Sequence, residues 1–473
     1  MNVQLGALLV YSAALILIGL WVGRRVKGTS DFFVAGRRLG PGLLFSTMLA
    51  ANIGAGSTVG AASLGYRDGL SAWWWVGSAG IGSIVLAFWI GPAIRRIAQA
   101  HDLRTVGDFL EHRYGRSARA IIAILLWVGT LAILAAQLIA VATILNVIIG
   151  IPKWSGCLIG GIVMTVYFTA GGLLTSAWVN LVELVVLLLG FAVAMPIALH
   201  AVGGLGGLEA ATATEPQFWQ FLHGGRSGIA YLAMLGPAFI ISPGLLQKIY
   251  GARDDRTVRI GVGLNGAVLL LFAFAPALLG MIARALHPGL PTIDLALPTL
   301  LMRDMPPVVG SLGLAALFSA EVSSADAILF MLSTSLSQDL YRRFVNPGAS
   351  DTTVLKVARW AAVVGGAAGV VLAIVSATII GTLSIFYTLL SVSLFVPILA
   401  GLYWRRAGLP EALASIGVGV GCLLAVQLAT GGRGVGPLTP DMLGLIASAL
   451  GFLFVLASRR PQSGRGPGLA VNQ

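Results

Sequence analysis

Charged residues are scarce in this sequence. Asp, Glu, Lys and Arg together make up 10% of its 473 residues, whereas hydrophobic residues make up 57%. A soluble domain contains roughly 25% charged residues, because water must solvate its surface. The composition therefore argues against a solvent-facing enzyme, a nucleic-acid-binding protein and a disordered regulator. It predicts a chain that lies in a lipid bilayer.

Cysteines and targeting signals are sparse as well. Cys157 and Cys422 lie in apolar stretches and indicate neither a disulfide framework nor a metal site. No positive charge precedes the first apolar run, whereas Arg24 and Arg25 follow it. A cleaved signal peptide has the reverse order, so we expect a first spanning helix with its N-terminus outside. Without a Walker A loop or a GxGxxG motif after a strand, no enzymatic activity is predicted.

Long hydrophobic runs, by contrast, are abundant. A spanning helix needs about 20 mostly apolar residues. The sequence predicts thirteen, at 5–23, 41–70, 73–94, 118–148, 155–172, 177–201, 227–250, 259–285, 307–336, 355–378, 381–404, 409–430 and 441–458. With the N-terminus outside, the 30 basic residues concentrate in cytoplasmic loops, as the positive-inside rule requires. The outer exceptions are Arg67, Lys153, Arg226, Arg284, Arg303 and Arg433.

Three acids, Glu183, Glu321 and Asp326, lie inside these spans, and no Lys or Arg lies deep in any of them. An ionised group at the centre of a bilayer costs at least about 2.5–3.5 kcal/mol, so such residues mark functional sites. An acid without a basic partner requires a cation, either a metal ion, a proton or a cationic substrate group. Alternatively, these carboxyl groups are protonated, hydrogen-bonded to serines or close to a loop.

The second span contains the sequence LAANIGAGSTVGAAS at 49–63. Gly54 and Gly56 weaken a helix there and free backbone carbonyls, as in the broken helices of secondary transporters. Tight helix packing through small residues is the alternative. The polar residues Asn52, Ser57 and Thr58 in the same stretch favour a break.

The span at 307–336 has small and hydroxyl-bearing residues on one face at 100° per residue. Such oxygens, which carry no full charge, suit a weakly held monovalent cation such as sodium. A serine-rich packing face is the alternative. The face contains Ala320, Ser323, Ser324 and Ala327, with Glu321 and Asp326 on opposite sides of it.

Two other spans have related features. In the sixth span, Asn180 and Glu183 lie three residues apart, so both can line one cavity. The span at 227–250 is interrupted by Pro237, Pro243 and Gly244. Spans two to six and seven to eleven each begin with an interrupted helix, which predicts an inverted repeat of five-helix units.

Several segments resemble those of the sodium/solute symporters, which carry sugars, amino acids, sialic acid, vitamins and small carboxylates. The resemblance covers nearly the whole chain. It implies an all-α membrane protein with a LeuT-type 5+5 inverted repeat, broken first and sixth core helices, and alternating access. The segments are SDFFVAGRRLGP at 30–41, LRTVGDFLEHRYG at 103–115, GGLLTSAWVN at 171–180, SSADAILFMLSTSLSQDLY at 323–341 and PILAGLYWRR at 397–406.

The resemblance also implies site residues. The family's sodium site combines backbone carbonyls of the broken helix with a hydroxyl pair, here Ala50, Ile53, Ala320, Ser323 and Ser324. Substrate contacts are implied at Asn52 and Ser57, an outer aromatic gate near Trp74 and Trp75, and an aromatic of the sixth core helix at Phe239. These aromatics fit an interfacial belt equally well. Gln137 and Tyr387 are further candidate substrate-binding groups.

The sequence departs from the family at a second sodium site. Many members have Asp at the position of Asn180, Gln at that of Glu183, and hydroxyls at those of Asp326 and Ala327. We therefore expect one full sodium site. The second is either absent or rebuilt, and Asp326, Glu183, Asn180 and Glu321 are the candidates for a second cation or proton site.

The sequence as a whole predicts a sodium-coupled symporter that imports a small organic solute of the amino acid, carboxylate, sugar or vitamin class. The alternatives are a proton-coupled or uncoupled carrier of the same fold and, less favoured, a membrane ligand sensor, since no output domain follows the last span. The expected partners are the solute, the sodium ion (Na+) and the lipid bilayer, with no nucleic acid and no obligate protein partner.

The expected location is the cell inner (plasma) membrane, with many passes and a cytoplasmic C-terminus. The predicted divisions are an extra N-terminal helix and cytoplasmic loop at 1–40, a first repeat at 41–201, an extracellular loop at 202–226, a second repeat at 227–404, and two C-terminal helices with a short tail at 405–473.

Overall fold

The computed structural model describes residues 37–222, 228 and 230–459, together with residues 6, 10, 13, 14 and 17. The side chains of 167, 169–183, 319, 323 and 326 lie outside the described part. The span expected at 5–23 also lies outside the continuously described residues. The described chain is almost entirely helical, as its hydrophobic runs predict.

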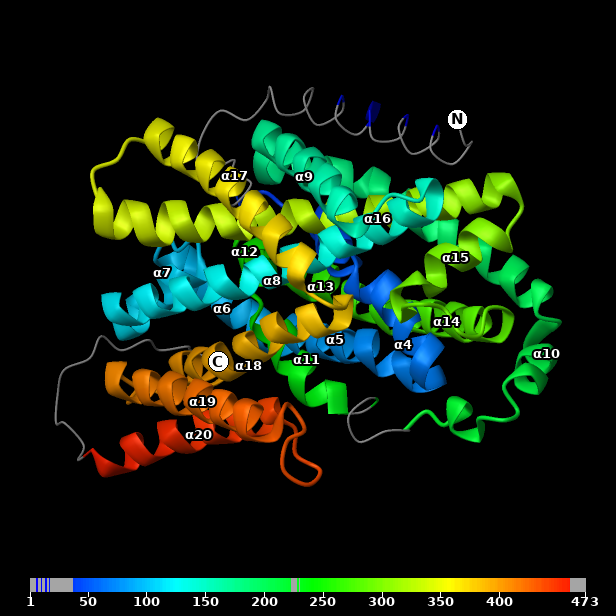
Figure 1. The fold of residues 1–473 in the computed structure, drawn as a ribbon. Helices are drawn as coiled ribbons and strands as arrows, with labels where there is room; N and C mark the ends of the chain where they lie inside the picture. The colour runs from blue at the N-terminus through cyan, green and yellow to red at the C-terminus, as the bar shows by residue number, and fades with distance from the viewer. Residues whose placement is uncertain are drawn as a thin grey trace.

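The helices follow one another closely from Pro41 to Ser458 (Figure 1). In chain order they are α3 (Pro41–Asn52), η2 (Gly56–Gly60), α4 (Ala61–Asp68), η3 (Gly69–Ala72), α5 (Trp73–Val85), η4 (Leu86–Ile90), α6 (Gly91–Ala100), α7 (Val106–Tyr114), α8 (Arg116–Ile149), α9 (Lys153–Ala201), α10 (Gly204–Ala211), η5 (Pro216–Trp219), α11 (Ala230–Ile241), α12 (Pro243–Tyr250), α13 (Asp255–Phe272), α14 (Phe274–Leu286), η6 (Ile293–Leu295), α15 (Ala296–Arg303), α16 (Pro307–Thr334), η7 (Ser335–Val345), α17 (Asp351–Val375), α18 (Ile379–Tyr403), α19 (Leu409–Thr430) and α20 (Pro440–Ser458).

Ten helices in the described part are long and apolar enough to cross a membrane. The expected count of thirteen is not reproduced, and the clearest difference is α9. This helix runs for 49 residues without a break, where the sequence predicted two spans at 155–172 and 177–201. The prediction divided the segment by length alone, and residues 173–176 contain neither a proline nor a charge to end a helix.

The second predicted span is interrupted where its glycines indicated. Helix α3 ends at Asn52, and Ile53 adopts an extended backbone with φ −103° and ψ 92° before the π-helical turn η2 begins at Gly56. Gly54 allows a close approach, because a Cβ at this position would lie 2.2 Å from Ser324 Oγ and 2.8 Å from Gln137 Oε1. A side chain at residue 54 would therefore push the break away from α8 and α16.

A second interruption separates α11 from α12. Ser242 leaves the helical conformation with φ −53° and ψ 122°, and Pro243 opens α12. Proline has no backbone N–H to continue the helical ladder, and it disfavours the helical conformation of the residue before it. The other predicted breaker, Pro237, lies inside α11 without ending it.

The helices pack in an order that is far from sequential. Helix α8 packs against α9, α16, α17 and α18, whereas α13 packs against α3 and α5. The C-terminal helices α19 and α20 pack on each other beside α18, and α9, α16 and α17 lie on the opposite side of the molecule (Figure 1). Large apolar side chains such as Trp360, Leu428 and Phe454 are exposed. Lipid tails, unlike water, solvate such surfaces at no cost.

Candidate functional site

The break between α3 and η2 is held by its own side chains. Ser57 Oγ accepts a hydrogen bond from the Gly54 amide at 3.0 Å and lies 2.9 Å from the Asn52 carbonyl, to which it donates. The Ala55 amide donates to Gln137 Oε1 on α8 at 2.8 Å. Two amides at the start of the second half-helix therefore have buried protein acceptors, which fix the shape of the break.

Thr58 and Glu321 meet on the other side of the break. Thr58 Oγ1 lies 2.9 Å from the Gly54 carbonyl and 3.0 Å from Glu321 Oε1. Glu321 is fully buried, and its Oε2 has no hydrogen-bond partner among the described residues. A buried carboxyl group with one open oxygen is costly unless a proton or a cation occupies it.

Two of the predicted sodium ligands, one on α16 and one near the end of α3, are in contact. Ser324 Oγ on α16 donates to the Ala50 carbonyl on α3 at 3.3 Å, and Ser324 is 2% exposed. Ile53 and Ala320 are buried beside them. The Ser323 side chain lies outside the described residues, as do those of Asn180, Glu183 and Asp326, the remaining candidates for a second cation site.

A cavity of about 400 Å³, here the central cavity, lies against the break. Its lining in the described part contains no acidic or basic side chain. All six predicted substrate-binding residues line it, namely Asn52, Ser57, Trp75, Gln137, Phe239 and Tyr387, and Ser324 lines it as well. Trp74 does not, because its indole Nε1 donates to the Phe221 carbonyl at 2.9 Å.

Aromatic rings separate the central cavity from a second one. Trp75 packs edge-on against Tyr231, with ring centroids 4.9 Å apart, and against Tyr387 at 6.0 Å. Beyond Tyr231 lies a cavity of about 1230 Å³, here the Arg67 cavity, which Arg67, Asp68 and Asp441 also line. Trp75 is 3% exposed, so this aromatic layer is closed.

The central cavity also adjoins a third cavity, and the rings of Phe239 and Tyr387, with centroids 5.5 Å apart, line both. It shares Ala51, Asn52, Ile133, Phe239 and Tyr387 with this neighbouring cavity of about 670 Å³, here the Lys248 cavity.

Sequence reasoning did not single out two polar residues near this site. Lys248 lines the cavity named after it, is 5% exposed, and its Nζ donates to the Thr47 carbonyl at 2.9 Å. Its place in the last turn of an interrupted span made it look like a loop residue. Asn265 on α13 accepts from Asn52 Nδ2 at 3.2 Å and is fully buried. A lone Asn in an apolar span was the available signal for it.

Comparisons with solved structures identify the fold. A Na+-coupled sialic acid symporter, solved in a substrate-bound outward-open state, matches with a TM-score of 0.82 over 99% of this chain and 100% of its own, at 18% identity. A nucleobase-cation-symport-1 family transporter, solved in a closed conformation, matches with a TM-score of 0.59 over 91% of this chain and 94% of its own, at 15% identity. The likeness confirms the LeuT-type fold expected from the sequence.

Comparisons of sequence identify the family. The chain is 28% identical over 459 residues to a sodium/pantothenate symporter of Escherichia coli, covering 91% of each. It is 25% identical to a sodium/glucose cotransporter of Vibrio parahaemolyticus, over 86% of this chain and 82% of that one. It is 24% identical to a high-affinity proline transporter of Bacillus subtilis, over 93% of this chain and 95% of that one. These relatives are transporters and not enzymes, and the model of the sodium:solute symporter family matches residues 32–419. The chain belongs to the sodium:solute symporter family.

Proposed function

We propose that this chain imports a small organic solute together with sodium by alternating access. The contact of Ser324 with the Ala50 carbonyl carries the proposal, because it joins the hydroxyl face of α16 to the last turn of α3. Sodium bound there would take both oxygens as ligands and replace their hydrogen bond. The carbonyls of Ile53 and Ala320 and the hydroxyl of Ser323 complete the proposed site.

The solute would bind in the central cavity, beside the sodium site. Asn52 and Ser57 belong to the same broken segment as Ala50 and Ile53, so the two sites share a backbone. The rings of Trp75, Phe239 and Tyr387 offer apolar faces, and Gln137 offers its amide nitrogen, since its Oε1 already accepts from Ala55. Polar solutes of the classes carried by the relatives fit such a lining.

Alternating access is supported by the three cavities in series. The Trp75–Tyr231 contact closes the central cavity toward the Arg67 cavity, whereas the Lys248 cavity shares its walls. With the N-terminus outside, the Arg67 cavity faces the exterior and the Lys248 cavity faces the cytoplasm. The breaks at Ile53–Ala55 and Ser242 support repeats at 41–201 and 227–404, which would rock against each other.

Binding of ²²Na⁺ to the purified protein tests the sodium site without knowledge of the solute. We expect saturable binding that sodium displaces and choline does not. Ser324→Ala should weaken it by about tenfold or more, because a direct ligand is lost. Ser333→Ala is the matched control: this serine is also buried on α16, but it bonds to the Phe330 carbonyl of its own helix. Equal affinity in wild type and Ser324→Ala would refute the site.

A thermal-shift screen of amino acids, sugars, vitamins and carboxylates, each with and without sodium, identifies the class of solute. A transported solute should stabilise the protein more in sodium than in choline, because the two bind the same conformation. Stabilisation that is the same in both salts would favour an uncoupled or proton-coupled carrier.

Glu321 is the described candidate for a second cation or proton. Its open Oε2 supports this role, with Asp326, Glu183 and Asn180 as further proposed members. Glu321→Gln keeps the size of the side chain and removes the charge. If Glu321 holds a second sodium, the number of ²²Na⁺ ions bound per protein should fall from two to one. An unchanged number excludes it as a sodium ligand.

A further inference from the structure

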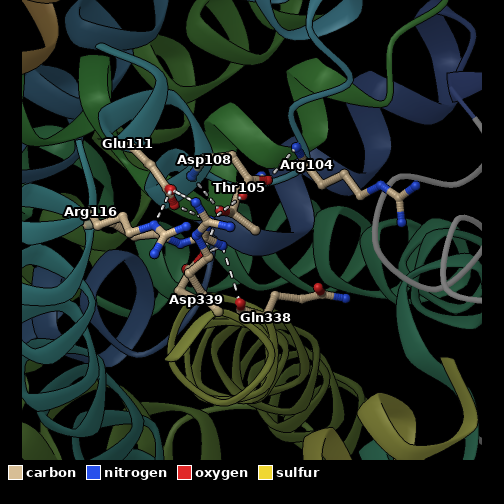
Figure 2. A network of polar contacts seen from close by, with 9 residues as sticks. Arg104, Thr105, Asp108, Glu111, Arg116, Gln338 and Asp339 are labelled. Atoms are coloured by element: carbon tan, nitrogen blue, oxygen red, sulfur yellow. Dashed lines mark hydrogen bonds and ion pairs between the residues drawn. The ribbon is translucent and has the colours of Figure 1, made fainter. Parts of the chain in front are cut away.

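Apart from the site around the broken helix, ion pairs join α7 and α8 to the π-helical segment η7. Arg119, at the start of α8, lies 2.9 Å from both Asp108 and Glu111 on α7 and 2.7 Å from Asp339 on η7. Arg343 on η7 pairs with Glu111 as well. Figure 2 shows the side chains of Asp108, Glu111 and Asp339 converging from α7 and η7.

An open cavity of about 990 Å³, here the Arg119 pocket, lies against this cluster. Its lining combines arginines from three elements with a few acids and two histidines. In Figure 2 the side chains of Arg104 and Gln338 extend to the same side of the cluster. The charged and polar residues of the lining are Arg104, Arg119, Arg342, Arg343, Asp102, Asp108, Glu111, His101, His112 and Gln338.

Buried donors in the Arg119 pocket lack hydrogen-bond acceptors. The buried polar side-chain atoms of its lining that have no partner in the described part of the chain are Arg119 Nε, Arg343 Nε and Gln338 Nε2. All three are N–H donors, whereas the carboxylates of Asp102, Asp108 and Glu111 are each engaged by an arginine. Gln338 is 8% exposed, so bulk water does not solvate its amide. A ligand that supplies acceptor oxygens would satisfy these three donors.

The charges of the Arg119 pocket also favour an anion. The pKa of Glu111 lies below its usual value: burial opposes its ionisation, but hydrogen bonds from Arg119 and Arg343 outweigh that effect. The Glu111 carboxylate is therefore ionised and already paired with Arg119 and Arg343. Burial, together with the neighbouring His101 and Arg113, lowers the pKa of His112, so this ring adds no positive charge at neutral pH. The attraction for an anion comes from arginines, which stay charged at all relevant pH values.

We propose that the Arg119 pocket binds a phosphate-type oxyanion. Guanidinium groups pair with such anions through parallel N–H donors, and a phosphate carries enough acceptor oxygens to meet the donors of α8 and η7 at once. The anion is either free phosphate or the headgroup of an anionic lipid, because both present phosphate oxygens.

Thermal unfolding of the purified full-length protein in phosphate-free buffer tests the site. Inorganic phosphate should raise the apparent Tm saturably, at an ionic strength held constant with chloride. Gln338→Leu and Arg343→Gln should each weaken the apparent affinity by about tenfold or more, because a buried donor is lost. Glu111→Gln should strengthen it, because the negative charge that competes with the anion for the arginines is gone. Arg406→Gln, an exposed arginine after α18, is the matched control and should leave it unchanged.

A second arm identifies the source of the anion. The protein is placed in nanodiscs of phosphatidylcholine alone or with phosphatidylglycerol, and phosphate is titrated into each. If the pocket takes the lipid headgroup, phosphatidylglycerol should raise the Tm and weaken the response to phosphate. If it takes the free anion, the response should be the same in both lipids. Absence of a saturable response in both arms overturns the proposal, and so does a response that Gln338→Leu and Arg343→Gln leave intact. Should Arg343→Gln not purify, Gln338→Leu decides alone.

Discussion

Gly54→Ala is the sharpest test of how the broken helix approaches α16. A Cβ on residue 54 would lie 2.2 Å from Ser324 Oγ, 2.5 Å from Ser324 Cβ and 2.8 Å from Gln137 Oε1. These distances lie far inside van der Waals contact. Ser324 Cβ cannot swing away, and Gln137 Oε1, although it ends its side chain, is held by the Ala55 amide. Added carbon in a packed site costs about 1–3 kcal/mol. The least costly relief is a separation of the break from α16.

That separation falls on the proposed sodium ligands, because the Ala50 carbonyl and Ser324 Oγ lie on its two sides. If the whole penalty is expressed as sodium affinity, the Kd rises by roughly 5- to 150-fold, at tenfold per 1.4 kcal/mol. The assay is ²²Na⁺ binding to the purified protein, with the apparent Tm recorded in parallel. Gly42→Ala is the control: it also changes a glycine of α3, but its Cβ meets nothing within 4 Å.

An unchanged sodium Kd in Gly54→Ala would refute this reasoning, since the close approach could then not matter for the ion. A second variant separates the clash from general damage. Ser324→Gly removes both the Oγ and the Cβ that residue 54 would strike. Added to Gly54→Ala, it should recover most of the lost Tm but not the sodium affinity, because a proposed ligand is missing as well.

Three further predictions concern the polar contacts. Arg119→Gln leaves Asp339, whose side chain is 5% exposed, without its cation and should destabilise the protein by about 3–5 kcal/mol; Asp339→Asn in the same chain should restore much of the apparent Tm. Gln137→Leu removes the acceptor of the Ala55 amide and should lower the free energy of unfolding by about 1–3 kcal/mol, measured as a lower apparent Tm. The same variant should abolish sodium-dependent stabilisation by solute. The stabilisation by ionised Glu111, whose pKa is lowered, is fully present above its ordinary pKa of about 4.3 and is lost as the pH falls through the lower folded value. As the pH falls below that ordinary value, the apparent Tm of the wild type should therefore approach that of Glu111→Gln.

The interruptions of the helices and the lining of the central cavity were predictable because their signals are local. Glycines and prolines inside apolar runs predicted the interruptions after Asn52 and at Ser242, and polar side chains in the same runs predicted part of the cavity lining. Gln137 and Tyr387 were chosen only as polar groups in apolar spans, yet both line the central cavity.

The features that escaped prediction depend on partners far along the chain. Arg119 reads as one more basic residue at a membrane surface, and only the fold brings it to Asp339, 220 residues away. Lys248 reads as the end of a span, whereas α12 turns it toward the Thr47 carbonyl. The length of α9 also escaped, because hydropathy indicates how many residues suit a bilayer but not where a helix ends.

The placement of the two proposed sites on one segment has an energetic consequence. Residues 53–55 lie between two helices without helical structure. Fixing the backbone of one such residue costs about 1–2 kcal/mol. The hydrogen bonds of Ser57 and Gln137 already favour one shape of this segment. An ion held by Ala50 and Ile53 would stabilise that shape further, so a solute that contacts Asn52 and Ser57 would bear less of the ordering cost. Because the coupling is reciprocal, solute must raise the affinity for sodium by the same factor as sodium raises the affinity for solute. With the two sites placed as proposed, the shared backbone would link ion and solute without a charged residue in the central cavity.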